Sequence, residues 1–259
     1  MTSPTLLLSQ TRRYSAFYGK AVRQLTRCRF DVRYRVQRLH EALSEQGLGT
    51  AGRRVLDVGF GAGDLLASFP HTCRVVGVDV SESAVLHARL DERFDGFRSA
   101  EFHCVPENAP QALPRQQFDI VISSHVLEHV PDDARLLQAM YERLAPGGIA
   151  AIFVPIEEPD YILFHRRNYS LQSITERIAY AGFQPVLVEG SLYVNGHVWK
   201  LLTIPSRRQW PLMRHVADGF RVGTLGVLSY RALRQLDQIL FRMGAGARQA
   251  LIIARRPPG

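Results

Sequence analysis

The feature that most constrains the fold of this chain is an apolar, strand-like run that ends in three glycines at alternate positions. Residues 55–58 precede Gly59, Gly61 and Gly63, and residues 65–69 favour a helix. Glycine has no side chain, so its backbone can turn tightly and approach a ligand closely, and the N–H groups at the start of the next helix face that ligand. The pattern predicts a strand, a ligand-binding turn and a helix in succession.

A second apolar run, at residues 75–80, contains an acidic residue about twenty positions after the glycines, which is the spacing of adenosine-binding folds. A carboxylate there, Asp79 in this chain, accepts hydrogen bonds from both ribose hydroxyls of an adenosine ligand. Ser81 is typical of a residue that caps a helix N-terminus. These motifs suit a nicotinamide dinucleotide and S-adenosylmethionine equally, so they leave the cofactor open.

Two later segments distinguish these cofactors. Residues 118–132 form an apolar strand followed by a segment with two histidines, and residues 144–149 contain a Pro-Gly-Gly turn. Together with the G-x-G-x-G turn, which has Asp57 two positions ahead, they resemble the ordered motifs of class I S-adenosylmethionine-dependent methyltransferases. The resemblance spans residues 53–155 and is to the small-molecule type found in ubiquinone and menaquinone biosynthesis. It implies S-adenosyl-L-methionine as the cofactor.

Strands and helices alternate along this part of the chain, which predicts an α/β fold with a parallel sheet. We expect a Rossmann-like, doubly wound, seven-stranded sheet with N-terminal helices and a helical insertion before the last strand. The expected strands are 53–58, 74–80, 100–105, 118–123, 149–154, 183–188 and 250–254. The expected helices are 11–28, 31–46, 63–69, 82–90, 107–112, 132–143 and 170–181.

The chain divides into four expected parts. Residues 1–52 form a helical flank and lid, residues 53–189 the cofactor-binding core, residues 190–248 a helical insertion, and residues 249–259 the last strand and tail. The insertion carries an apolar stripe that is typical of core packing, with solvated arginines between its members: Leu225, Leu228, Leu233, Leu236, Ile239, Leu240 and Met243. We predict that the insertion caps the acceptor pocket, although such a helix could also lie on a membrane.

The family resemblance also implies roles for individual residues. Gly59 and Gly61 would lie against the methionine portion of the cofactor, Asp57 near its amino group, Asp79 at the ribose and Val80 at the adenine. Where the family often has an acid after the third strand this chain has Val105, and Glu107 could take its place. The full set of expected cofactor residues is Asp57, Gly59, Gly61, Gly63, Asp79, Val80, Glu107, Ser123, Ser124 and His125, with Tyr14 and Tyr18 as a lid.

Methylation of an oxygen or an activated carbon usually needs a base, and histidine suits that task near neutral pH. His165 is our first candidate and His129 our second, because both follow strands that end at the cofactor edge. A capping or packing role for Glu128 and His129 is at least as good an interpretation. Glu157, Glu158 and Asp160 could bind a cation, but solvated loop acids are the preferred interpretation, and we predict no metal site.

Charge is uneven along the chain. The net formal charge is +8 for residues 1–54, −9 for residues 55–199 and +9 for residues 200–259. The basic flanks could attract an anionic small molecule, a membrane surface or RNA. Solvated arginines on amphipathic helices are the simpler interpretation. RNA is less favoured because the Pro-Pro-aromatic motif of many enzymes that methylate nucleic-acid nitrogens is absent after the fourth strand.

Three widely spaced cysteines without metal-ligand spacing indicate free thiols in a reducing cytoplasm, and no apolar run is long enough to cross a bilayer. We therefore predict a cytoplasmic S-adenosylmethionine-dependent methyltransferase. Its acceptor would be a small molecule, apolar or anionic, methylated at a hydroxyl. Peripheral membrane contact is compatible with this prediction. The alternatives are an RNA methyltransferase and a non-catalytic subunit with the same fold.

Overall fold

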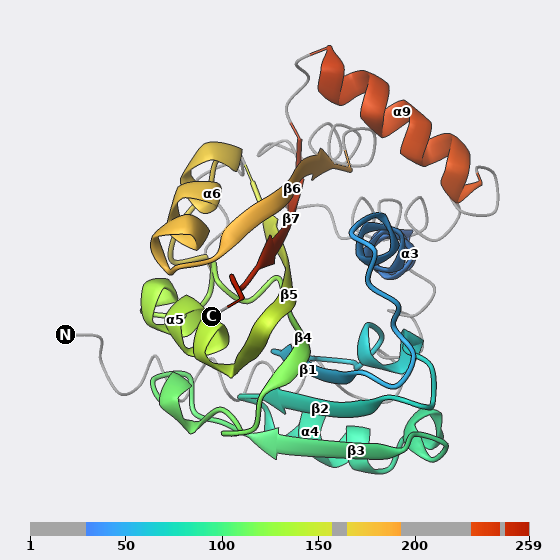
Figure 1. The fold of residues 1–259 in the computed structure, drawn as a ribbon, viewed down its shortest axis with the longest axis vertical. Coiled ribbons are helices and arrows are strands. Elements are labelled where there is room, and N and C mark those ends of the chain that lie inside the picture. Colours follow the sequence, from blue (N-terminus) through green and yellow to red (C-terminus); the bar gives the residue numbers. More distant parts are fainter. Residues whose placement is uncertain (1–29, 157–164, 193–228, 244–246, 259) are drawn as a thin grey trace, which may run out of the picture.

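A computed structural model describes residues 30–156, 165–192, 229–243 and 247–258. Within them seven strands form one sheet in the order β3-β2-β1-β4-β5-β7-β6 (Figure 1). The first five strands pair in parallel, and β7 pairs antiparallel with both β5 and β6. The strands are β1 Arg54–Val58, β2 Arg74–Asp79, β3 Ser99–Cys104, β4 Phe118–Ser124, β5 Leu144–Pro155, β6 Gln184–Ser191 and β7 Gln249–Arg255. The predicted doubly wound α/β sheet is confirmed.

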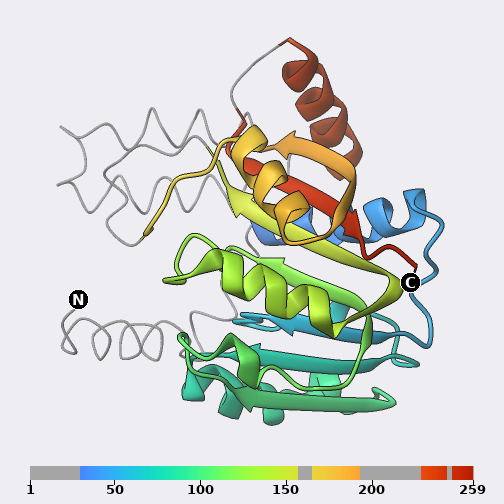
Figure 2. The ribbon, with the colours of Figure 1, turned by 60° about the vertical axis from the view of Figure 1, so that its left-hand side comes forward.

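Helices cover both faces of the sheet. They are α3 Phe30–Glu45, α4 Glu82–Arg89, α5 Asp133–Arg143, α6 Leu171–Tyr180 and α9 Tyr230–Arg242. Helices α5 and α6 pack with one set of strand residues into one core, and α3 and α4 pack with the alternate set into a second (Figure 2). Alternate residues of a strand point to opposite faces, so a strand buried on both sides reads as a continuous apolar run. That is why residues 118–123 were recognisable from sequence.

The capping residues act as the sequence suggests. The backbone N–H of Ala84 donates to Ser81 Oγ at the start of α4, and that of Arg135 donates to Asp132 Oδ1 at the start of α5. At α6, Ser170 and Ser173 cap each other reciprocally. These caps satisfy N–H groups that have no partner inside the helix, which fixes where each helix begins.

The predicted helix at 63–69 is wrong, and the short helix predicted near 107–112 is only a single 3₁₀ turn. Residues 63–69 form turns and a short 3₁₀ helix, Leu66–Ser68, and residues 107–112 contain only the 3₁₀ helix Pro110–Ala112. Phe69 is extended because it precedes Pro70, and the residue before a proline avoids the helical region. Pro110 and Pro114 restrict the second segment in the same way.

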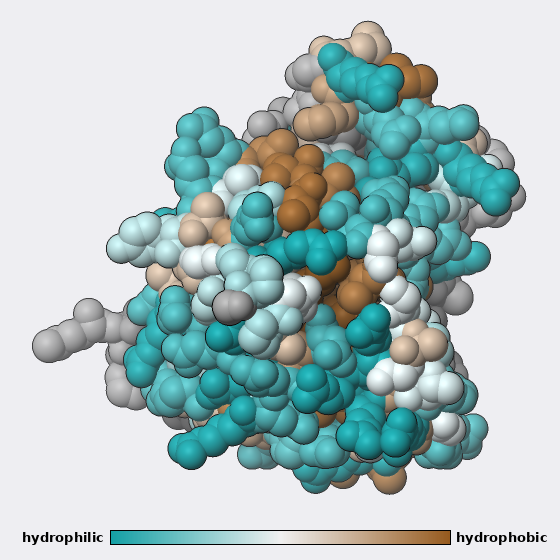
Figure 3. All heavy atoms as spheres, in the orientation of Figure 1, coloured by the Kyte–Doolittle hydropathy of each residue, from teal (hydrophilic) through white to brown (hydrophobic). Residues whose placement is uncertain are grey.

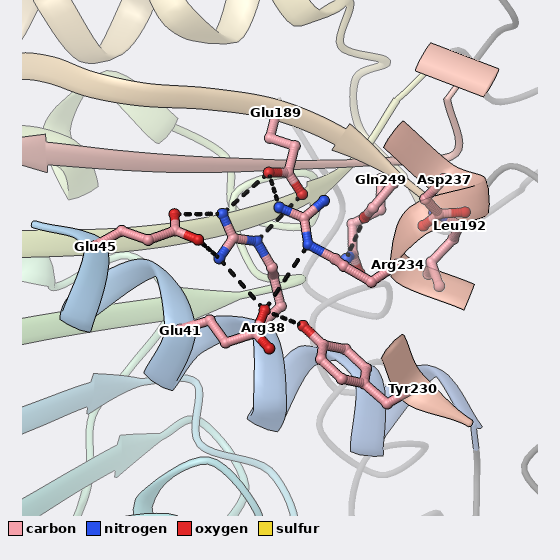
Figure 4. Close-up of polar contacts among 10 residues, drawn as sticks. Arg38, Glu41, Glu45, Glu189, Leu192, Tyr230, Arg234, Asp237 and Gln249 are labelled. Atoms are coloured by element: carbon pink, nitrogen blue, oxygen red, sulfur yellow. Dashed lines mark hydrogen bonds and ion pairs between the residues drawn. The ribbon is translucent and has the colours of Figure 1, made fainter. Parts of the chain in front are cut away.

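Helix α9 packs beside β6 and α3 through charged side chains. Glu189 of β6 accepts hydrogen bonds from Arg38 of α3, at 3.0 and 3.2 Å, and from Arg234 of α9 at 2.7 Å (Figure 4). Tyr230 donates to Glu41 of α3 at 2.6 Å. Arg38 is 1% exposed and Arg234 9%, so these charges are buried together. The contacts join three elements that are far apart in sequence.

The prediction for the insertion was partly wrong. Leu233 is buried, but Ile239 is 54% exposed and Met243 76%, whereas the supposedly solvated Arg234 and its neighbour Asp237 are buried. The reason is that α9 faces charged partners on α3 and β6 rather than an apolar surface. Figure 3 shows hydrophobic side chains gathered on this face between α6 and α9. Residues 193–228 of the insertion and the helix expected at 11–28 lie outside the described residues.

Candidate functional site

The glycine turn brings β1 and the β4 loop into close contact. Gly59 has a φ of +77°, and a Cβ added to it would lie 2.3 Å from Val126 Cγ2, so no other residue fits without movement. The backbone N–H of Gly59 donates to the carbonyl of Val78 at 2.7 Å, and that of Gly61 donates to Asp79 Oδ2 at 2.9 Å. The turn is thus held against the end of β2, where strand order reverses between β1 and β4 and where ligands of such sheets bind.

Asp79 is fixed by the backbone on both sides. Its Oδ1 accepts from Ser81 N at 2.9 Å while its Oδ2 accepts from Gly61 N. The carboxylate is 7% exposed, and burial raises its pKa despite these hydrogen bonds. A carboxylate has about four acceptor positions, so two remain for ligand hydroxyls.

Asp57 is a buried carboxyl with unused hydrogen-bonding capacity. It is 1% exposed, and its Oδ1 has no hydrogen-bond partner among the described residues. Burial, and secondarily the neighbouring charge of Asp79, raises the pKa of Asp57 to about 8. Ser123, beside it at the end of β4, is fully buried, and within the described structure its Oγ also has no hydrogen-bond partner. Both groups are therefore buried polar atoms near the strand ends with unused hydrogen-bonding capacity.

A cavity of about 250 Å³ opens beside the glycine turn. Its wall is largely apolar, and its polar positions come from the ends of β2 and β4 and from the loop after β3. The lining residues are Val58, Gly59, Val78, Asp79, Val80, Val105, Pro106, Glu107, Asn108, Pro110, Leu113, His125, Val126, His129, Val130 and Leu136. It is an apolar slot with a few convergent polar groups, as small-molecule sites usually are.

The cavity brings together six of the residues singled out from sequence: Gly59, Asp79, Val80, Glu107, His125 and His129. Asp57, Gly61, Gly63, Ser123, Ser124 and His165 do not border it, although Asp57 directly precedes the lining residue Val58. Burial raises the pKa of Glu107 despite Arg166, whose Nη2 lies 3.6 Å away. Tyr14, Tyr18, Glu157, Glu158 and Asp160 lie outside the described residues.

His125 has a backbone conformation that is unusual for a residue with a side chain. Its φ is +57°, in a region that costs an L-residue about 1–2 kcal/mol. Its Nε2 lies 3.0 Å from Gln249 Oε1, and Gln249 Nε2 donates to Ser191 Oγ at 3.1 Å. Its Nδ1 lies 3.4 Å from Glu128 Oε1. The ring is held from both sides, in a strained conformation of the kind that occurs at functional sites.

Glu128 lies beneath the two loop histidines. It is 1% exposed, and neither carboxylate oxygen has a hydrogen-bond partner among the described residues. His129 Nε2 lies 3.8 Å from Glu128 Oε1, slightly farther than His125. Burial alone would raise the pKa of Glu128, but contact with His125 and His129 lowers it below its ordinary value. Glu128 is therefore an ionised, buried carboxylate.

His165 joins this group from a distant part of the sequence. Its ring lies 4.9 Å from that of His129, edge to face. The two residues that follow it hold it there: Arg166 Nε donates to the carbonyl of His129, and Arg167 donates to the carbonyls of Leu127 and Val130, each at 2.7 Å. Glu128, His129 and His165 thus form one cluster at the rim of the cavity.

Sequence reasoning missed two residues of this site. Glu128 was assigned a capping or packing role, but residues 127–129 form a turn and its side chain points into the histidine cluster. Gln249 was not considered, although a polar residue at the start of an otherwise apolar strand is a usable signal. It is 1% exposed and reaches His125 across 124 positions of sequence.

None of the helices within the described ranges is long and apolar enough to span a membrane.

Comparison with known proteins gives consistent results. A family model described as a methyltransferase domain matches residues 29–199. The ubiquinone biosynthesis O-methyltransferase of Psychrobacter arcticus is 35% identical over 130 residues, which are 48% of this chain and 49% of that protein. The chain therefore spans about half the length of the curated relatives it matches.

Solved structures share the fold at low sequence identity. A methyltransferase in complex with the Haloferax volcanii Trm112 activator has a TM-score of 0.60 at 18% identity, over 94% of this chain and 97% of that one. The Burkholderia thailandensis 1,6-didemethyltoxoflavin-N1-methyltransferase, with bound 1,6-didemethyltoxoflavin and S-adenosylhomocysteine, has a TM-score of 0.56 at 17% identity, over 99% of this chain and 92% of that one.

Proposed function

The chain belongs to the class I S-adenosylmethionine-dependent methyltransferase family, and from this premise we propose that it methylates a hydroxyl oxygen of a small molecule. One observation carries the proposal. The cavity beside the glycine turn and Asp79 continues to His129, where Glu128 and His165 gather. A neutral hydroxyl must lose its proton as it is methylated, and this cluster places basic groups next to the cofactor side of the cavity.

The described residues fit S-adenosylmethionine. Gly59 leaves the cavity open at the turn, and Asp79 has acceptor capacity left for two ribose hydroxyls. Val80 lines the apolar slot where an adenine would lie, and Glu107 lines the same slot two residues after Val105. Asp57 supplies a buried carboxyl suited to a ligand amino group. When bound, the cofactor supplies a methyl group already activated by its sulfonium.

The remaining tasks belong to the chain itself. The cavity wall excludes water and orients the acceptor, which accounts for much of the acceleration in a displacement reaction. His165 and His129 are our candidates to accept the hydroxyl proton, with Glu128 stabilising the resulting positive charge. The O-methyltransferase name of the Psychrobacter relative supports oxygen over nitrogen as the acceptor atom.

We further propose that residues 190–248 cap the acceptor side and that Tyr14 and Tyr18 close over the cofactor. Support for the cap comes from the described end of β6. Leu192 donates its backbone N–H to Asp237 of α9, while the adjacent Ser191 connects through Gln249 to His125. Helix α9 is therefore linked by hydrogen bonds to the edge of the sheet at which the cavity lies.

The test measures binding and transfer separately. Calorimetry with S-adenosylhomocysteine should give saturable binding, and tritiated methyl groups should pass to phenolic members of a panel of phenols, carboxylic acids and amines. His129→Asn and His165→Asn should each slow transfer by about 100-fold or more, with cofactor affinity unchanged. His103→Asn is the matched control, because His103 also faces a glutamate, Glu101 at 3.5 Å, but lies exposed on β3. Labelling of amines alone would contradict the proposal.

A further inference from the structure

We propose that Gln249 is a positioning residue of the cofactor cavity and that it acts through His125. Gln249 begins β7, whereas His125 follows β4 and lines the cavity. The contact between them joins positions 124 apart, with His125 Nε2 lying 3.0 Å from Gln249 Oε1. The inference rests on the proposed function only for the ligand that fills the cavity, because the contact itself belongs to the fold.

Gln249 is a buried amide whose oxygen and nitrogen both have partners. It is 1% exposed, and the residues from Ala250 to Ala254 that follow it in the strand are all apolar. Its Nε2 donates to Ser191 Oγ at 3.1 Å, which directs its oxygen toward the ring of His125. Burying an amide costs free energy unless it is hydrogen-bonded, and packing of this strand does not require one. Its presence therefore indicates a role in orienting its partners.

The ring of His125 faces a hydrogen-bond acceptor at each nitrogen. Nδ1 lies 3.4 Å from Glu128 Oε1, and Nε2 faces the oxygen of Gln249. The ionised carboxylate of Glu128 and the amide oxygen of Gln249 can only accept, so both ring nitrogens act as donors. Imidazole has two N–H groups only in its positively charged form. The arrangement thus holds a cationic ring between a carboxylate and an amide.

The backbone of His125 explains why the ring needs this support. Its φ is +57°, in a region that residues with a Cβ usually avoid. The backbone N–H donates to the carbonyl of Phe153 at 2.9 Å, which fixes the main chain but not the rotation of the ring. Strained conformations persist only where their surroundings hold them. Gln249 provides that hold from a strand that is paired on both sides, with β5 and with β6.

The same support extends toward the candidate base. One oxygen of Glu128, Oε1, lies 3.4 Å from His125 and 3.8 Å from His129. Burial raises the pKa of Glu128, but the hydrogen bond and charge of His125, followed by the charge of His129, lower it overall. His125 is therefore the main partner of this carboxylate. If its ring turned away, Glu128 would lose the contact that keeps it beside His129, so Gln249 orders a series of contacts that ends at the candidate base.

The test compares variants that preserve the length of the side chain. Gln249→Met removes the acceptor oxygen, whereas Gln249→Glu keeps an acceptor at the same reach. Ser191→Ala removes the partner that orients the amide. Gln184→Met is the matched control, because Gln184 is exposed at the start of the neighbouring strand β6.

Long-range ¹H–¹⁵N NMR of the full chain, with ¹⁵N-labelled histidine and no cofactor, shows which ring nitrogens carry protons. His125→Asn identifies the signals of His125. Its Nε2 should be protonated in the wild type, and the ring signals should change in Gln249→Met and Ser191→Ala but persist in Gln249→Glu. Calorimetry should show about tenfold weaker binding of S-adenosylhomocysteine by Gln249→Met, with Gln249→Glu and Gln184→Met within about threefold of the wild type.

A wild-type His125 without a proton on Nε2 would overturn the proposal, and this measurement does not depend on whether any variant folds. Identical ring signals in the wild type and in Gln249→Met, with circular dichroism showing that both are folded, would overturn it as well. Changed ring signals with unchanged cofactor affinity would refute the role of Gln249 in the cavity. Failure of the wild type to bind S-adenosylhomocysteine would instead overturn the proposed function, and the ring signals would still decide whether Gln249 orients His125.

Discussion

Replacing Asp57 by asparagine tests whether this buried carboxyl is protonated before the cofactor binds. The folded-state pKa of Asp57 is raised to about 8 from an ordinary value of 3.8. Between these values the folded protein keeps a proton that the unfolded chain has lost. The contribution of Asp57 to stability is therefore complete below about pH 4 and disappears as pH rises through 8. Asparagine has nearly the same shape but does not titrate.

The magnitude follows from proton linkage. One extra proton bound in the folded state changes the free energy of unfolding by about 1.4 kcal/mol per pH unit. From pH 5 to pH 7 the wild type should therefore lose about 2.7 kcal/mol relative to Asp57→Asn. Urea unfolding followed by circular dichroism at pH 5, 6, 7 and 8, without cofactor, measures this difference.

Asp119 provides a control of opposite sign. Hydrogen bonds and charge contact from Arg54 lower its pKa against the effect of burial, so it is ionised throughout this pH range. Asp119→Asn should shift stability by a constant amount between pH 5 and 7. Parallel curves for the wild type and Asp57→Asn would refute the argument, because they would show that Asp57 does not titrate in this range.

Cofactor binding supplies a second readout of the same group. If Asp57 meets the amino group of the ligand, binding favours the ionised carboxyl and releases a proton below pH 8. Calorimetry of S-adenosylhomocysteine in buffers of different ionisation enthalpy should detect this release in the wild type and not in Asp57→Asn. Equal proton release in both proteins would place the amino group elsewhere.

Three other substitutions are informative. Gly59→Ala combines a positive φ with a Cβ 2.3 Å from Val126, so urea unfolding should show a loss of about 2 kcal/mol or more in the free energy of unfolding. Adding Val126→Ala to this variant should recover only part of the loss, and full recovery would rule out backbone strain. Asp79→Ala should weaken S-adenosylhomocysteine binding by about ten- to a hundredfold, and unchanged calorimetric affinity would remove it from the ribose site. Arg38→Met should lower the free energy of unfolding by about 3 kcal/mol, because Arg38 is buried with Glu189. Arg54 is half-exposed, so Arg54→Met should lower it by under about 1 kcal/mol, and equal effects would contradict the importance of burial.

The sheet was predictable because each strand can be recognised from its local apolar sequence pattern. Residues 118–123 are apolar on both faces, and Asp132 and Ser170 mark helix starts by their own chemistry. The predictions failed where contacts with residues distant in sequence determine which face of an element is buried. The apolar stripe between residues 225 and 243 is typical of core packing, yet α9 turns Arg234 toward Glu189, which no local pattern of the helix reveals.

The candidate site likewise contains residues that local motifs predict and residues that only distant contacts bring together. Gly59 and Asp79 were recognisable because motif spacing encodes their proximity, and both line the cavity. The meeting of His165 with His129 depends on Arg166 and Arg167 binding backbone carbonyls, and carbonyl acceptors leave no trace in sequence. The burial of Glu128 likewise follows from the packing of the whole edge.

The position of β7 between β5 and β6 has a consequence for the order of assembly during translation. Ser191 and Gln249 are partners 58 positions apart, so β6 leaves the ribosome well before the strand it pairs with. At about 5–20 residues per second this interval lasts about 3–12 s. During this interval β6 has no strand to pair with, and the Glu189 to which α9 binds is not yet held in a sheet. The nascent chain must keep this edge from pairing with other molecules, which makes slow translation of the insertion a hazard for its yield.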